Sequence, residues 1–236
     1  MQIYFVRHAD PDYMHNCITP LGHLQAQACA ARLVDREITA VYSSTLGRAT
    51  QTAAYIGEAL GMPVTELDFI HEVVTGLQGL TGEEQKKLSP WLGCDLLIKQ
   101  GVDLTTVDWE QSPLWGQGNR FKESYFRVTE GFDRWIEEAL GYRREGPYYR
   151  CLRAPGRSVD RPLIVAHGGS IACLIAHFFN VDPMIIIPHV HLRCTGITVF
   201  EWGETEGEIC TPKAITINDS DHVRGLKITD ADEHPQ

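Results

Sequence analysis

Two histidines of this chain stand at the ends of short apolar runs. His8 follows Arg7 at the end of the run 3–6, and His167 follows the run 163–166. The first run is too short for a helix and is rich in β-branched and aromatic residues, and both runs predict buried strands. Ligands of open α/β sheets bind beyond the carboxyl ends of the strands, so both histidines are predicted to lie at a binding site.

The elements that position these histidines alternate between strand and helix patterns. Thr19 is a good N-cap before Pro20, and Gly61 is placed to end a second helix. Such alternation is typical of a parallel sheet. The predicted strands cover 3–6, 38–44, 62–67 and 163–166, and the predicted helices lie in 18–37, 46–61 and 170–179. A turn is predicted at 168–169. An antiparallel pair of strands is predicted from 195–202 and 208–219.

The stretch from about 73 to 161 departs from this rhythm, and we interpret it as an insertion. It contains helical patterns at 82–88 and 121–140, and Gly- and Pro-rich loops at 112–119 and 144–162. The sequence therefore predicts one domain over 1–236. Its expected fold is a three-layer α/β sandwich, in which helices flank a mostly parallel central sheet and the helical and loop insertion lies over the site.

The composition argues against several classes of protein. The net charge of −10 opposes nucleic-acid binding, which depends on Lys and Arg. No 18-residue apolar run and no basic N-terminal leader pattern occur, so we expect a cytoplasmic protein with no membrane association. The seven cysteines form no C-x-x-C pair, which favours reduced thiols over disulfides or a structural zinc site.

Three motifs in order carry a resemblance to a known family. They are Arg7-His8 after the first strand, SSTLGRATQTA around Arg48, and VAHGGSI around His167. With these motifs the chain resembles the histidine phosphatase superfamily, which includes the cofactor-dependent phosphoglycerate mutases, over most of 1–72 and 162–200. The resemblance implies a phosphorylated small-molecule substrate. We expect no cofactor and no metal, because arginine and histidine supply the positive charge that such a site requires.

The resemblance also implies roles for individual residues. His8 would attack phosphorus and form a phosphohistidine, and His167 would donate to the phosphoryl oxygens in the transition state. Guanidinium groups suit the planar, bidentate binding of a phosphoryl group, and they disfavour a proton on the neighbouring nucleophile. The implied phosphate-binding residues are Arg7, Arg48, Asn16 and Gly168.

A leaving alcohol needs a proton, and the segment 69–84 contains the main candidate donors. Glu72 matches the acid of the family, because the Gly and the LQGL run after it resemble those of the mutases with one residue fewer. A bound phosphate raises the pKa of a neighbouring carboxyl, which suits a general acid. Glu83, Glu84 and Asp10 are the alternatives.

The loop 9–19 bears on the reaction type. It is shorter than in the mutases and lacks their Trp-Asn pair, and since that loop helps to hold the mutase substrate, its loss favours hydrolysis by water. We therefore expect a phosphomonoesterase acting on a small organic phosphate. A phosphoglycerate-mutase-type phosphotransferase and a phosphate-binding regulatory module without turnover stay open as alternatives, as does a homodimer.

The segment 141–162 concentrates arginines in an otherwise acidic chain. Most of them fit a solvated loop, and the alternative hypothesis is an anion-gathering lid over the site. The arginines are Arg143, Arg144, Arg150, Arg153, Arg157 and Arg161. We also expect an aromatic side chain at the mouth of the site, with Trp91, Trp109, Trp115, Tyr148 and Tyr149 as candidates.

His189 and His191 are two imidazoles that the pattern places on one side of a strand, as a metal site could use. No Cys or carboxylate cluster accompanies them. We interpret the pair as structural, or as a support for the site, and predict no metal there.

Overall fold

The computed structural model describes residues 1–74, 90–110, 120–154 and 160–226. Several predictions fall on the other residues and lie outside the described part of the chain: the helix at 82–88, the loop at 112–119, and the side chains Glu83, Glu84, Trp115 and Arg157.

A six-stranded sheet forms the centre of the molecule, in the order β11-β9-β1-β8-β4-β5. The strands β1, β8, β4 and β5 are parallel neighbours, whereas β9 runs antiparallel to both β1 and β11. The predicted parallel sheet and the predicted antiparallel pair at its edge are thus confirmed. The strands are β1 (Gln2–Arg7), β4 (Ala40–Ser44), β5 (Val64–Leu67), β8 (Pro162–Ala166), β9 (Ile197–Glu201) and β11 (Lys213–Asp219).

The helices begin and end largely where the sequence predicts. The Thr19 hydroxyl accepts a hydrogen bond from the Gly22 N–H as the N-cap of α1, and Gly61 ends α2 in the left-handed conformation with φ of 65°. The predicted turn at 168–169 is instead the first turn of α6, because His167 caps that helix. The helices are α1 (Pro20–Leu33), α2 (Gly47–Leu60), α4 (Pro90–Lys99), α5 (Arg120–Leu140), α6 (Gly168–Phe179) and α7 (Pro183–Ile186), with single 3₁₀ turns η1 (Val34–Arg36), η2 (Asp68–Ile70) and η4 (Asp221–Val223).

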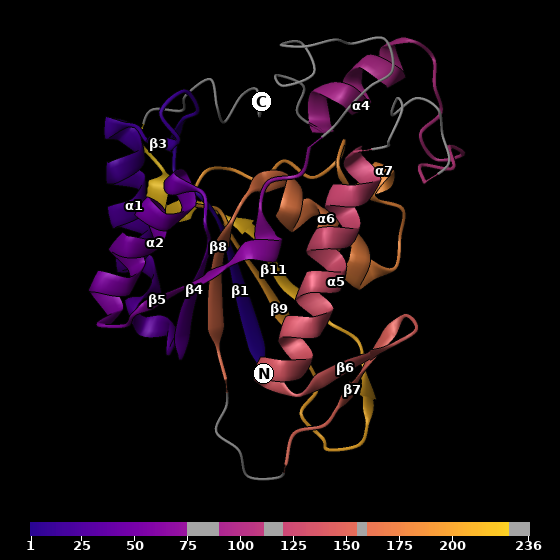
Figure 1. The fold of residues 1–236 in the computed structure, drawn as a ribbon. Helices are drawn as coiled ribbons and strands as arrows, with labels where there is room; N and C mark the ends of the chain where they lie inside the picture. Colours follow the sequence, from indigo (N-terminus) through magenta and orange to yellow (C-terminus); the bar gives the residue numbers. More distant parts are fainter. Residues whose placement is uncertain (75–89, 111–119, 155–159, 227–236) are drawn as a thin grey trace.

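Helices cover both faces of the sheet (Figure 1). The alternation of strand side chains explains the two layers of core: Phe5 of β1 packs toward α5 and α6, whereas Tyr4 and Val6 pack toward α1 and α2. The three-layer α/β fold is therefore confirmed. All seven cysteines have free thiols, and five of them are buried.

The predicted insertion contributes to more than one part of the molecule. Helix α5 buries one face of its length, including Phe121, Val128 and Phe132, against the sheet and α6, so it forms part of the main core. Helix α4 lies toward the end of the molecule where β1 and β8 finish, and the strands β6 and β7 lie at the opposite end (Figure 1). In the described ranges, no helix combines the length and the apolar character needed to span a bilayer.

A hairpin replaces part of the loop predicted at 144–162. Its strands β6 (Tyr142–Glu145) and β7 (Tyr148–Cys151) join β10 (Ile209–Cys210) in a small sheet, and β2 (Pro11–Asp12) pairs with β3 (Cys17–Ile18) in another. Gly146 takes a φ of 58°, which suits the first position of a two-residue hairpin turn. The Gly-Pro pair that suggested a loop is therefore the hairpin's turn.

Candidate active site

The parallel pairing of β1 and β8 brings the two strand-end histidines together. Arg7 and Ala166 are register partners, so His8 and His167 follow side by side at the same edge of the sheet. Their ring centroids lie 5.2 Å apart, and both side chains are almost fully buried. The sequence-based expectation that the two histidines share one site agrees with this geometry.

The hydrogen bonds of His8 define which nitrogen is available for chemistry. Its Nδ1 lies 2.8 Å from the Ala9 carbonyl oxygen, which only accepts, so Nδ1 carries the proton. Its Nε2 then carries the lone pair and accepts from the Arg48 Nε at 3.2 Å. Because a guanidinium only donates, this hydrogen bond requires an unprotonated Nε2, and this basic nitrogen faces a cationic group.

Arg48 stands in the first turn of α2 and is only 8% exposed. Its Nη1 donates to the Asn16 side-chain oxygen at 3.1 Å, so the structure brings Asn16 to the site through Arg48. Gly47 makes this approach possible: a Cβ there would lie 2.1 Å from the Asn16 carbonyl oxygen. Asn16 itself adopts a φ of 50°, a left-handed conformation that asparagine tolerates.

His167 is the N-cap of α6, and Gly168 is the first residue of that helix. The His167 Nε2 lies 2.9 Å from the Ser44 hydroxyl at the end of β4. The N–H groups of a first helical turn have no intrahelical partners and favour a bound anion. This places Gly168 where its backbone suits the predicted phosphate-binding role.

The Arg7 guanidinium is held from the loop after α7. Its Nη1 donates to the Leu192 carbonyl oxygen at 2.5 Å, and the side chain is 3% exposed. The same loop contains His189, whose Nδ1 donates to the Ile185 carbonyl oxygen at 2.8 Å. The loop is not the strand that the His189 and His191 pattern predicted, and its Leu192 carbonyl holds Arg7 at the site.

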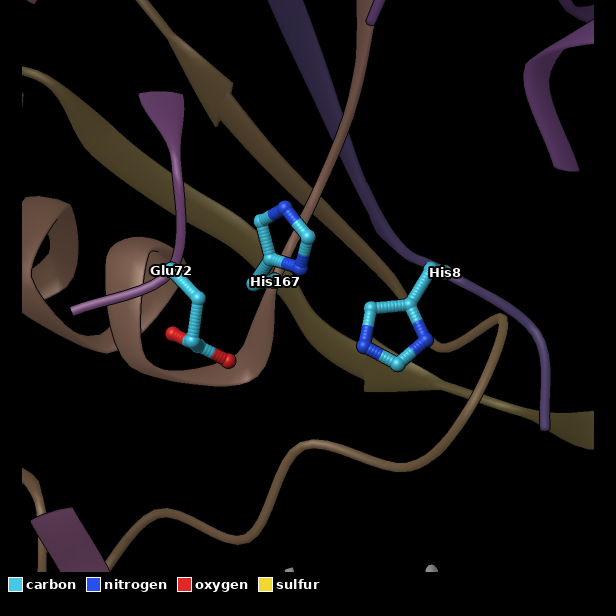
Figure 2. Close-up of side chains that lie close together, drawn as sticks. All are labelled: His8, Glu72 and His167. Carbon is cyan, nitrogen blue, oxygen red and sulfur yellow. The ribbon is translucent and has the colours of Figure 1, made fainter. Parts of the chain in front are cut away.

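Glu72 lies next to the two histidines (Figure 2). One ligand-type atom from each of Glu72, His8 and His167 falls within 4.8 Å of the others. The carboxyl also approaches α6 closely, since a Cβ at Gly169 would lie 2.5 Å from the Glu72 Oε1. Of the alternatives to Glu72, the carboxylate of Asp10 accepts from the Thr19 hydroxyl at 2.5 Å beside the cap of α1.

Burial governs the charge state of the site. It lowers the pKa of His8 well below the ordinary value of 6.5, and the charges of Arg7 and Arg48 lower it further. Burial likewise lowers the pKa of His167. Burial raises the pKa of Glu72 above the usual 4.5, against the opposing charge of Arg48. Burial and the neighbouring guanidinium groups thus favour neutral imidazoles, and burial shifts the Glu72 carboxyl toward its protonated form.

The cluster of His8, Glu72 and His167 has the donor types of a metal site, but its surroundings favour an anion. The Arg48 guanidinium donates to the very Nε2 that would bind a metal ion, and Arg7 lies nearby. A cation placed there would meet two like charges. The residues therefore fit a phosphoryl group and do not fit a metal ion.

The arginine-lid hypothesis is wrong for the described arginines. Arg143 pairs with Glu137, Arg150 with Glu145, Arg153 with Asp160 and Arg161 with Glu37, while Arg144 donates to the Asn180 side chain. The hairpin that carries three of them lies at the opposite end of the sheet from the histidines (Figure 1). Two of these partners, Asn180 and Glu37, are remote in sequence, whereas Glu137, Glu145 and Asp160 lie five to seven residues from their arginines.

Aromatic side chains border the site at two positions. Trp91 lies against Gly168, where a Cβ would come within 2.9 Å of its ring. Tyr13, which the sequence analysis missed, presents its ring to His8 and lies under the Arg48 guanidinium carbon at 5.3 Å. The sequence signal for a role of Tyr13 was its position, five residues after His8. The other described candidates lie elsewhere: Trp109 is in the core, and Tyr148 and Tyr149 are in the hairpin.

Comparisons with known proteins identify the family of the chain. The model of the histidine phosphatase superfamily (branch 1) matches residues 3–213. The Yersinia enterocolitica protein named "Probable phosphoglycerate mutase GpmB" is 26% identical over 198 residues, which cover 78% of this chain and 77% of that protein.

Two solved structures are similar in fold. A phosphoserine phosphatase mutant from Entamoeba histolytica, in complex with phosphoserine, has a TM-score of 0.62 at 16% identity and covers 94% of this chain and 98% of its own. A mycobacterial glucosyl-3-phosphoglycerate phosphatase with inorganic phosphate has a TM-score of 0.62 at 23% identity, with 94% and 99% covered. With the family model matched across most of its length, the chain belongs to the histidine phosphatase superfamily.

Proposed function

We propose that this protein is a phosphomonoesterase that hydrolyses a small organic phosphate through a phosphohistidine on His8. The observation that carries the proposal is the pair of hydrogen bonds on His8. The Ala9 carbonyl oxygen keeps the proton on Nδ1, and the positively charged Arg48 guanidinium lies next to the Nε2 lone pair. A phosphoryl group bound by Arg48 would therefore lie against the nucleophilic nitrogen.

In the first step, the His8 Nε2 attacks phosphorus and the bond from phosphorus to the ester oxygen breaks. Arg7, Arg48 and His167 bind the phosphoryl oxygens, on which negative charge concentrates in the transition state. The Glu72 carboxyl gives its proton to the leaving oxygen, so the alcohol departs neutral and Glu72 becomes a carboxylate.

In the second step, water attacks phosphorus in the phosphohistidine. The Glu72 carboxylate takes a proton from that water, the bond from phosphorus to Nε2 breaks, and inorganic phosphate leaves. His8 returns to its neutral form and Glu72 to its acid form. The raised pKa of Glu72 suits a group that alternates between acid and base.

The leaving group would lie toward Tyr13 and Trp91. Tyr13 is 39% exposed, and its ring meets His8 edge-on. Aromatic surface of this kind packs against rings and sugar faces. We therefore infer a substrate with such a group, in keeping with the glucosyl group in the name of the similar mycobacterial phosphatase.

A phosphoglycerate mutase is the second candidate, because the curated relative carries that name. The two activities differ in the fate of the phosphoryl group. One assay separates them: the purified protein is incubated with nitrophenyl phosphate, 3-phosphoglycerate and a panel of phosphorylated metabolites, with the His8→Ala variant as control. Release of inorganic phosphate that requires His8 supports the esterase. Isomerisation of phosphoglycerate without phosphate release identifies a mutase, and phosphate binding without turnover identifies a regulatory module.

A further inference from the structure

The segment 71–74, which carries Glu72, is held by helix α5. The Arg127 Nη2 donates to two successive carbonyl oxygens, those of His71 at 3.2 Å and Glu72 at 3.0 Å. One turn earlier on the same helix, the Ser124 hydroxyl accepts from the Val74 N–H at 3.1 Å. Two side chains of α5 thus bind the backbone on both sides of the Glu72 side chain.

A third position of α5 extends this contact. Gly131 lies seven residues after Ser124, on the same face of the helix. A Cβ at Gly131 would come within 2.3 Å of the Phe69 Cβ, so η2 packs directly on the helix backbone there. On its other side the segment meets α6, where a Cβ at Gly169 would collide with the Glu72 carboxyl. The segment is therefore clamped between two helices, and Arg127 supplies its polar contacts from α5.

Arg127 uses its charge in an uncommon way. In the ranges described here, its hydrogen bonds go to these two backbone carbonyls and none goes to a carboxylate. The guanidinium is half-buried, and burial lowers its pKa. Removing a cation from water costs free energy, and the two charge-assisted hydrogen bonds to the carbonyl oxygens must offset that cost. What they achieve is a fixed position for the Glu72 main chain.

We propose that Arg127 is a positioning residue for the proton transfer by Glu72. It does not touch the substrate, and it lies outside the three sequence motifs of the site. It holds the Glu72 backbone so that the carboxyl faces the leaving oxygen. This inference rests on the proposed function, since it assigns a support to the acid of that reaction.

The dependence of the rate on the leaving group distinguishes a positioning role of Arg127 from a purely structural one. A nitrophenolate leaves without protonation, whereas an alkoxide needs the proton of Glu72. A positioned acid contributes about 10²–10⁴ to the rate, and a displacement of about 1 Å costs about 10². Loss of Arg127 should therefore slow alkyl esters far more than nitrophenyl esters. A merely structural arginine would slow both equally.

The experiment compares Arg127→Met, Glu72→Gln and the double variant, with Arg134→Met as the matched control. Arg134 is on the same helix but is exposed, with an ion pair to Glu130 at 3.9 Å. The measured quantity is kcat/KM for glycerol 2-phosphate and for nitrophenyl phosphate, because kcat/KM covers only the steps up to the loss of the leaving group. Melting temperature is measured for every variant.

We expect Arg127→Met to lower kcat/KM for the glycerol ester by about 10- to 100-fold and to leave the nitrophenyl ester within about threefold. In the Glu72→Gln background, Arg127→Met should add little, because the acid that it positions is gone. Arg134→Met should change neither substrate. Ser124→Ala, which removes the Val74 contact, should show the same selectivity with a smaller loss and serves if Arg127→Met does not fold.

Equal losses for both esters in Arg127→Met and Ser124→Ala, or full additivity with Glu72→Gln, would overturn the inference. A wild-type protein that shows no turnover dependent on His8 would instead contradict the proposed function. The two failures are distinguishable, because the first leaves wild-type activity in place.

Discussion

Gly169→Ala tests the placement of Glu72 without changing any group that does chemistry. The new Cβ would lie 2.5 Å from the Glu72 Oε1 and 2.4 Å from the Val73 Cγ2. Ordinary van der Waals contact begins at 3.4 Å, so the carboxyl must withdraw by about 1 Å. Displacement of a catalytic group by that amount costs about 100-fold in rate. We expect kcat/KM for alkyl phosphates to fall by about 100-fold.

The assay needs a control for steric damage in general. Gly57→Ala places a methyl group 2.9 Å from the Met62 carbonyl oxygen, more than two turns along α2 from Arg48. It should lower the melting temperature and leave kcat/KM nearly unchanged. Alanine is otherwise favoured over glycine within a helix by about 0.5–1 kcal/mol, so Gly169→Ala should still fold. Full alkyl phosphatase activity in Gly169→Ala would refute the placement of Glu72 as the acid.

Four further predictions concern the site and its surroundings. Because burial and two guanidinium groups lower the pKa of His8 below 6.5, kcat/KM should hold at pH 6 and fall only at lower pH, where His8 binds a proton. By the same shift, urea titrations should show the free energy of unfolding decreasing as the pH falls below 6.5, since only the unfolded imidazole binds a proton there. An acid limb of kcat/KM at or above 6.5 would contradict the first expectation, and a free energy of unfolding that stays constant below pH 6.5 would contradict the second. Replacing Arg143, Arg144 and Arg150 together should leave KM unchanged for singly and multiply charged esters, and a steep rise for the latter would restore the lid hypothesis. Tyr13→Ala should raise KM for esters with a ring and spare small alkyl esters, and an equal rise for both would show that Tyr13 supports Arg48 instead.

The strand-end histidines could be predicted because their signals are local. A four-residue apolar run predicts a strand, and the residue after it in a parallel sheet lies at the ligand-binding edge. Adjacent parallel strands then bring His8 and His167 together. The ends of α1 and α2 were predicted for the same reason, since Thr19 and Gly61 cap helices through their own backbone and side-chain chemistry.

The features that escaped prediction depend on how the chain folds in three dimensions. Arg127 lies 55 residues from the carbonyl of Glu72 that it binds, and no spacing rule connects the two. The hairpin arginines suggested a lid because the sequence shows neither the place of the hairpin at the far end of the sheet (Figure 1) nor the contact of Arg144 with Asn180, 36 residues away. Tyr13 was overlooked since an aromatic residue in a loop acquires a role only when the loop folds back over His8.

The most direct test of the account is to trap the covalent intermediate. The protein is mixed with a substrate carrying a radiolabelled phosphoryl group and quenched in alkali, in which phosphohistidine survives, and the labelled peptide is then identified. We predict label on the peptide that contains His8, and none in the His8→Ala variant. Turnover without any alkali-stable label, or label on His167 in place of His8, would contradict the central claim.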